Sequence, residues 1–166
     1  MHSKTTADAL WTALEAADKR KDVIQTGTAG SNHSTKNAVG LSNGHAYTVL
    51  SVIKIKDDSG TEVKLVKVRN PWGTENYKGD YSDSSAKWTS EAMKTRAGMV
   101  KANDGEFFMP IDLYKKWMSD TTINFNMDKV TTAHHLTLNA PKNNNTGKIY
   151  CTTCTYYKFN VTTATN

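Results

Sequence analysis

The chain has 166 residues, of which 37% are apolar and 22% are charged. That length and composition are typical of one soluble globular domain with an attached segment. No run of residues is long and apolar enough to span a membrane, and the first residues lack the apolar stretch of a signal peptide, so we expect an intracellular, cytoplasmic protein. The formal net charge of +5 comes from lysines that are scattered rather than clustered with aromatic side chains, which argues against nucleic acid as a partner.

A helix is the first predicted element. Thr5 or Thr6 can cap its N-terminus, and residues 19–21 are basic, as suits a helix C-terminus. Its apolar stripe consists of Leu10, Trp11, Leu14 and Ala17. A short strand at residues 23–24 follows. Residues 26–43 are rich in Gly, Ser, Asn and Thr and predict a long loop, which is either functional or only a mobile part of the surface.

Residues 47–68 predict a β-hairpin. Residues 47–55 are apolar and mostly β-branched, residues 62–68 largely alternate between apolar and charged, and residues 56–60 between them carry turn-forming Asp, Ser and Gly. If the chain reverses within residues 57–60, the numbers of opposed residues add up to about 117. Asn70 then lies roughly opposite Tyr47, and His45 lies roughly opposite Trp72.

This register brings His45, in the motif Gly-His-Ala-Tyr, and Asn70, in the motif Arg-Asn-Pro-Trp-Gly, to one edge of the sheet. A His that acts as a general base presents one ring nitrogen to the nucleophile, and an Asn carboxamide oxygen can hold the other. Trp72 is placed to cover that bond from water. In the alternative interpretation, His45 ends a strand, Asn70 makes a turn before Pro71, and Trp72 belongs to the core.

Two acidic loops and a second helix follow the hairpin. Carboxylates with neighbouring glycines at residues 79–83 and 104–106 offer oxygen ligands for a hard cation, although two acidic loops alone do not make a metal site. Residues 109–118 predict a short amphipathic helix with Ile111, Tyr114, Trp117 and Met118 on one side. Residues 121–125 predict a strand.

The segment from about Ala7 to Val130 resembles the second subdomain of the calpain protease core, which belongs to the papain-like cysteine peptidases. The residues that carry the resemblance are Gly44–Tyr47, Val63–Arg69, Arg69–Gly73, Gly79–Ser85, Trp88 and Asp104–Met109. The resemblance implies that His45 is the catalytic His, Asn70 the catalytic Asn and Trp72 the tryptophan that shields them. It also implies protein substrates.

The resemblance further implies a calcium site, because calpains are usually calcium-dependent. The family's ligands map onto the side chains of Asp83, Asp104 and Glu106 and onto the backbone carbonyl of Ala102. A further carboxylate of the family maps onto Asn76, which is uncharged although Glu75 precedes it.

The family's nucleophilic Cys lies in the first subdomain of the core, and nothing before His45 corresponds to it. The only cysteines are Cys151 and Cys154, which lie downstream of the resembling region and make at most half of a zinc pattern. With His134 and His135 they could recruit a metal, but two thiols on a Thr-rich strand are more often inert. We therefore expect either one part of a longer protease, which needs a Cys-bearing subdomain as its partner, or a shorter relative without activity. By itself the chain should be inactive.

These features predict an α+β fold, a twisted antiparallel sheet with flanking helices that is similar to the β-rich half of papain-like proteases. Residues 5–130 form the predicted protease subdomain. Residues 131–166 form a β-rich tail or the start of a following domain. The predicted function is the His- and Asn-bearing half of a calpain-type cysteine endopeptidase, and the alternative is a non-catalytic calpain-like structural or interaction domain.

Overall fold

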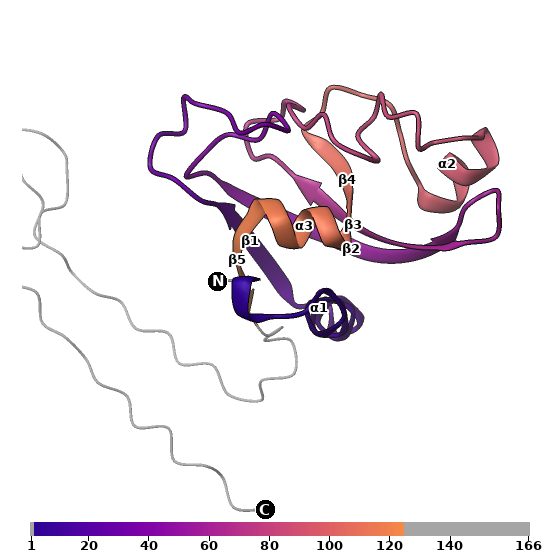
Figure 1. The fold of residues 1–166 in the computed structure, drawn as a ribbon, viewed down its shortest axis with the longest axis horizontal. Coiled ribbons are helices and arrows are strands. Elements are labelled where there is room, and N and C mark those ends of the chain that lie inside the picture. The colour runs from indigo at the N-terminus through magenta and orange to yellow at the C-terminus, as the bar shows by residue number, and fades with distance from the viewer. Residues whose placement is uncertain (1, 125–166) are drawn as a thin grey trace, which may run out of the picture. The chain divides into compact units, whose positions relative to one another are not determined.

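The computed structural model describes residues 2–124 of the chain (Figure 1). Their strands form one antiparallel sheet in the order β4-β3-β2-β1-β5, which confirms the predicted α+β class. The elements are η1 (His2–Lys4), α1 (Ala7–Arg20), β1 (Val23–Thr28), β2 (Ala46–Lys56), β3 (Glu62–Arg69), α2 (Glu91–Ala97), β4 (Glu106–Pro110), α3 (Ile111–Trp117) and β5 (Met118–Asn124).

Helix α1 forms as the sequence predicts. The hydroxyl of Thr6 accepts a hydrogen bond from the backbone N–H of Ala9, so Thr6 rather than Thr5 is the cap. The helix ends at Arg20 and is capped by Lys21, which adopts a left-handed conformation. All four residues of the predicted stripe are buried.

The β2–β3 hairpin contains a bulge that the sequence analysis does not predict. Thr48 pairs with Arg69, as the predicted register requires, but the pairing shifts by one residue at Leu50 before it continues to Lys56 and Glu62. This bulge changes which side chains point to which face of the sheet, so Val49 and Val52 both lie in the larger core.

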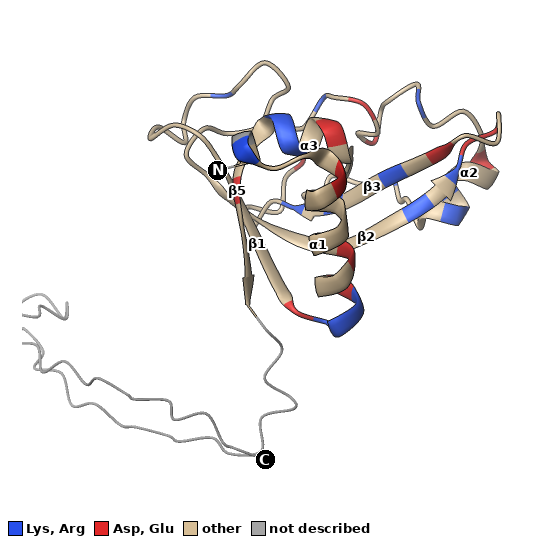
Figure 2. Cartoon of the chain, turned by 60° about the horizontal axis from the view of Figure 1, so that its bottom comes forward, with Lys and Arg blue, Asp and Glu red and all other residues tan. Residues whose placement is uncertain are grey.

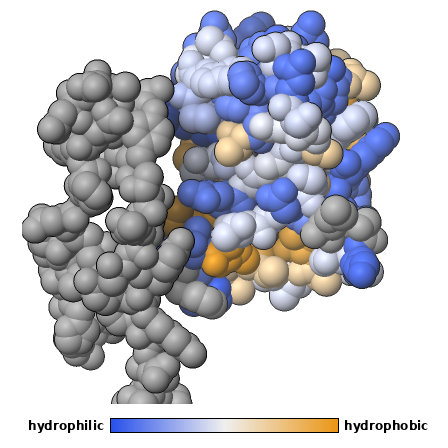
Figure 3. Space-filling view, turned by 90° about the vertical axis from the view of Figure 1, so that its left-hand side faces the viewer, coloured by the Kyte–Doolittle hydropathy of each residue, from blue (hydrophilic) through white to orange (hydrophobic). Residues whose placement is uncertain are grey.

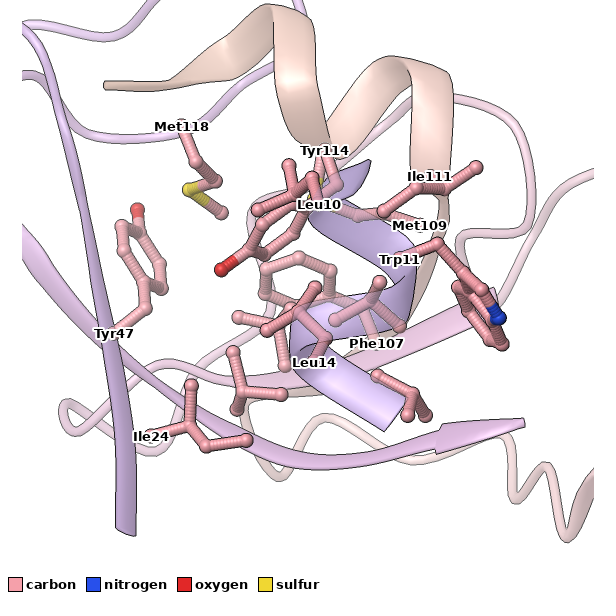
Figure 4. Close-up of a cluster of buried hydrophobic side chains, with 14 of the residues drawn as sticks. Leu10, Trp11, Leu14, Ile24, Tyr47, Phe107, Met109, Ile111, Tyr114 and Met118 are labelled. Atoms are coloured by element: carbon pink, nitrogen blue, oxygen red, sulfur yellow. The ribbon is translucent and has the colours of Figure 1, made fainter. Parts of the chain in front are cut away.

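The sheet is covered on both faces. Alternating residues of β3 and β4 point in opposite directions, so Val66 and Phe107 join the larger core with α1 and α3, whereas Leu65 and Phe108 pack with α2 and the segment before it. Figure 2 shows α1 and α3 in front of the strands, and Figure 4 shows the side chains of the larger core. The sheet therefore has a well-packed support on the α1 and α3 side of the hairpin.

The structure corrects several predicted boundaries. Strand β1 continues to Thr28, so the predicted loop begins later than residue 26, and α3 begins at Ile111 because the preceding residues belong to β4. Helix α2 was not predicted, although Ser90 caps it and Gly98 ends it in a left-handed conformation.

The loop between β1 and β2 projects at the left of Figure 1, and Figure 3 shows that the upper part of this side is largely hydrophilic.

The predicted tail, residues 131–166, and its cysteines lie outside the described residues, as does the last residue of the strand predicted for residues 121–125. The division into two domains therefore stays a prediction. Across the part of the chain that the structure describes, no helix has the length and apolar character needed to cross a membrane.

Candidate active site

The imidazole of His45 and the carboxamide of Asn70 are in direct contact. His45 immediately precedes β2 and Asn70 immediately follows β3, so the paired strands bring them together. The Nε2 atom of His45 lies 2.9 Å from Oδ1 of Asn70. The hairpin therefore places the two side chains as the sequence register predicts.

A network of backbone groups fixes the orientation of the Asn70 amide. Its Nδ2 donates to the carbonyl of Thr74 at 2.9 Å, and its Oδ1 also accepts from the N–H of Trp72 at 3.1 Å. The side chain is 1% exposed. Because Oδ1 faces His45 in this network, we expect Nε2 of His45 to donate the hydrogen of this bond, which leaves Nδ1 for another partner.

Two aromatic rings contact the imidazole of His45. The ring of Trp72 lies 4.0 Å from it at 37°, and the ring of the buried Tyr47 meets it edge-on at 4.8 Å. Trp72 remains 51% exposed, so one side of the site faces solvent. The ring of His33, which no sequence motif singled out, meets the Trp72 ring edge-on, with the two ring centres 6.0 Å apart.

Two glycines allow the backbone to approach closely around this pair. Gly105 has a φ of +86°, and a Cβ built there would lie 2.8 Å from the carbonyl oxygen of Asn70, whose N–H donates to the Gly105 carbonyl. Gly44 has a φ of +56°, and a Cβ there would lie 2.6 Å from the carbonyl oxygen of Gly30. Larger residues would displace the segments that carry Asn70 and His45.

The acidic loops bring carboxylates close together, and the largest resulting change is in the pKa of Glu75. Burial raises its pKa to about 7, and the charges of Asp83 and Asp104 add to the effect. Burial, and then the charge of Asp104, also raises the pKa of Asp83. The sequence placed Glu75 beside the site, but did not identify it as the carboxylate that faces Asp83, whose N–H donates to it at 3.3 Å.

The residues predicted as metal ligands are engaged with protein groups. Asp83 accepts from the N–H of Ala102 at 2.9 Å, Asp104 accepts from the N–H of Glu106 at 2.9 Å, and Glu106 forms an ion pair with Lys67 at 2.6 Å. Within residues 2–124, no group of three or more His, Cys, Asp or Glu side chains is arranged to hold a metal ion.

Asn76, where the resemblance places a carboxylate, is hydrogen bonded to a lysine. Its Oδ1 accepts from the ammonium of Lys36 at 2.8 Å. Glu75 is therefore the residue of this segment that brings negative charge to the acidic loops.

Comparison with known proteins gives a consistent result. A family model described as calpain family cysteine protease matches residues 1–124. Human calpain-14 is 39% identical over 107 residues, which cover 64% of this chain and 15% of that protein. Rat calpain-9 is 38% identical over 107 residues, covering 61% of this chain and 15% of that protein, and human calpain-9 is 32% identical over 119 residues, covering 68% and 17%. The chain thus matches less than a fifth of the length of these relatives.

Proposed function

This chain belongs to the calpain family of cysteine proteases, and we propose that it is the His- and Asn-bearing subdomain of a calpain-type endopeptidase. The observation that carries the proposal is the 2.9 Å contact between Nε2 of His45 and Oδ1 of Asn70. That contact leaves Nδ1 available for a thiol, because no group among residues 2–124 hydrogen bonds to it.

In the proposed reaction, His45 is the general base and then the general acid. Its Nδ1 takes the proton of a Cys thiol as the sulfur attacks the carbonyl carbon of the peptide bond, and the same proton passes to the amine as the C–N bond breaks. His45 next takes a proton from water, whose oxygen attacks the thioester carbon, and returns it to the departing sulfur. Asn70 accepts from Nε2–H throughout and so holds the ring in one orientation.

The nucleophile is proposed to come from a Cys-bearing subdomain, with proteins as substrates. The resemblance places that Cys before His45, and this chain has its cysteines only at positions 151 and 154. Removing the nucleophile from a triad leaves only the residual acceleration that comes from binding and the oxyanion hole. We therefore propose that the chain alone does not cleave peptides. Its intracellular location stays a prediction.

We also propose that the acidic loops take calcium, since calpains are in general regulated by it. The raised pKa values of Glu75 and Asp83 support this, because a divalent cation would relieve the repulsion between their partly buried carboxylates. Asp83, Asp104 and the carbonyl of Ala102 would hold the ion and Glu75 would supply the charge that position 76 lacks, after a rearrangement of the loops, since no three such side chains within residues 2–124 are arranged to hold a metal ion. Glu106 could join only by leaving Lys67.

Complementation with a Cys-bearing first subdomain from a calpain relative tests the proposed function. We expect neither part to cleave casein alone and the mixture, with reductant and calcium, to cleave it. The variants His45→Ala and Asn70→Ala should lower the rate of the mixture, His45→Ala to background. A mixture that binds but does not cleave would favour the non-catalytic interaction domain, and cleavage that survives His45→Ala would refute the assigned base.

A further inference from the structure

A buried hydroxyl holds the backbone of His45 from the neighbouring strand. Thr28, the last residue of β1, is 7% exposed. Its Oγ1 accepts from the backbone N–H of His45 at 3.1 Å and donates to the backbone carbonyl of Ser42 at 2.5 Å. One side chain therefore satisfies a donor and an acceptor of the segment that leads into the candidate active site.

The hydroxyl of Thr28 accepts a hydrogen bond that a backbone carbonyl would accept in a continuing sheet. The β1–β2 pairing ends at Gly27 and Ala46, and the next two opposed residues are Thr28 and His45. In a continuing antiparallel ladder such a pair would exchange two backbone hydrogen bonds. Here the N–H of Thr28 does donate to the carbonyl of His45 at 3.0 Å, but the N–H of His45 donates to the Thr28 side chain instead.

The hydroxyl of Thr28 is also linked, through Ser42, to the aromatic ring of Tyr47 beside His45. The N–H of Ser42 donates to the phenol oxygen of Tyr47 at 3.1 Å, and the Tyr47 ring meets the His45 ring edge-on. Ser42 and Tyr47 are 1% and 3% exposed, so this network is shielded from water. A loss of the Thr28 hydroxyl would loosen both the backbone of His45 and the segment that anchors Tyr47.

We infer that Thr28 is a positioning residue for His45: its hydroxyl fixes the backbone at the point where the ladder ends, and so aims the imidazole at Asn70 and keeps Nδ1 in place. The inference rests on the proposed function, because positioning matters only if His45 is the general base. A displacement of a reacting group by about 1 Å can cost about 100-fold in rate.

Three substitutions separate this role from ordinary stability. Thr28→Val keeps the shape but leaves the N–H of His45 and the carbonyl of Ser42 without their partner, whereas Thr28→Ser keeps the hydroxyl. The matched control is Thr26→Val. Thr26 lies on the same strand, is 3% exposed and also donates to a backbone carbonyl, that of Asp120 at 2.7 Å, but it does not contact His45.

The first readout is the hydrogen-exchange rate of the His45 Nε2 proton, measured by NMR on the complete 166-residue chain. We expect Thr28→Val to speed this exchange by at least about tenfold, and Thr28→Ser and Thr26→Val to leave it close to the original rate. Equal exchange in Thr28→Val and Thr26→Val would overturn the inference. If Thr28→Val does not fold, Thr28→Ala, which cannot crowd the site, takes its place with the same expected result.

The second readout is the kinetics of the complemented protease. Thr28→Val should lower kcat by about 10- to 100-fold and change KM by less than about twofold, because substrate contacts are untouched. An unchanged kcat in an active mixture would overturn the positioning role. A mixture that is inactive with the unaltered chain would instead refute the proposed function, while the NMR result would still decide whether Thr28 holds His45.

Discussion

The raised pKa of Glu75 should make the chain less stable as the pH rises, whereas a carboxylate with a lowered pKa makes a protein more stable. Its pKa rises from an ordinary 4.5 to about 7, first through burial and then through the charges of Asp83 and Asp104. Between these two values the folded chain binds more protons than the unfolded chain, so the free energy of unfolding falls as the pH rises. The loss is complete above about pH 7.

The size of the effect follows from the shift. At about 1.4 kcal/mol for each pKa unit, the rise from 4.5 to about 7 corresponds to roughly 3.5 kcal/mol. Since Glu75 is only partly buried, solvent screening reduces this to roughly 1–2 kcal/mol. The variant Glu75→Gln keeps an acceptor for the N–H of Asp83 and removes the charge, so it should be more stable than the original chain by that amount at pH 8.

Urea unfolding at several pH values, with a chelator present, measures this difference. We expect the advantage of Glu75→Gln to shrink steadily and to disappear near pH 4.5. Glu62→Gln, which removes an exposed carboxylate at the start of β3, is the control for the change in net charge. A difference that is the same at pH 5 and pH 8, or a destabilised Glu75→Gln, would refute the assignment of the raised pKa to this residue.

Three further predictions concern the site and its loops. Gly44→Ala should lower the free energy of unfolding by roughly 1–3 kcal/mol more than Gly60→Ala in urea titrations, because both glycines have positive φ but only Gly44 would clash with a neighbouring backbone; equal costs would contradict this. Calcium should release or absorb measurable heat in calorimetry with the chain and not with Asp104→Asn, and no heat at about millimolar calcium would dismiss the site. The isolated chain should leave a fluorogenic peptide intact in the presence of reductant, and cleavage abolished by His45→Ala would show that another residue supplies the nucleophile.

The hairpin and the contact at its end were accessible from the sequence because they depend on local rules. Turn residues at 57–60 and the apolar runs on either side predict the hairpin. Opposed residue numbers add up to 118 next to the turn and, beyond the bulge at Leu50, to the predicted 117 at Thr48 and Arg69, and this pairing brings His45 to Asn70. Helix α1 was accessible for the same reason, since its cap and its apolar stripe lie within one segment.

What the sequence did not reveal depends on contacts between distant segments. The bulge at Leu50 and the final residues of β1 follow from pairing with other strands, and Thr26 and Thr28 look like loop residues until their hydroxyls find partners across the sheet. The bond between Asn76 and Lys36, forty positions away in the chain, and the bond between Glu75 and the N–H of Asp83 are likewise contacts between segments that the sequence alone does not show. Sequence periodicity does not determine which partner a side-chain hydroxyl or charge finds, so only the fold shows what these groups contact.

The tautomer of His45 tests most directly whether Asn70 holds it as a general base. Nitrogen-15 NMR of the 166-residue chain above the titration range of the imidazole distinguishes a hydrogen on Nε2 from one on Nδ1, and His33, which does not contact Asn70, serves as the reference within the same spectrum. We predict that His45 carries its hydrogen on Nε2 and that Asn70→Ala removes this preference. A hydrogen on Nδ1, or a preference for Nε2 that Asn70→Ala leaves unchanged, would contradict the orientation on which the proposed chemistry depends.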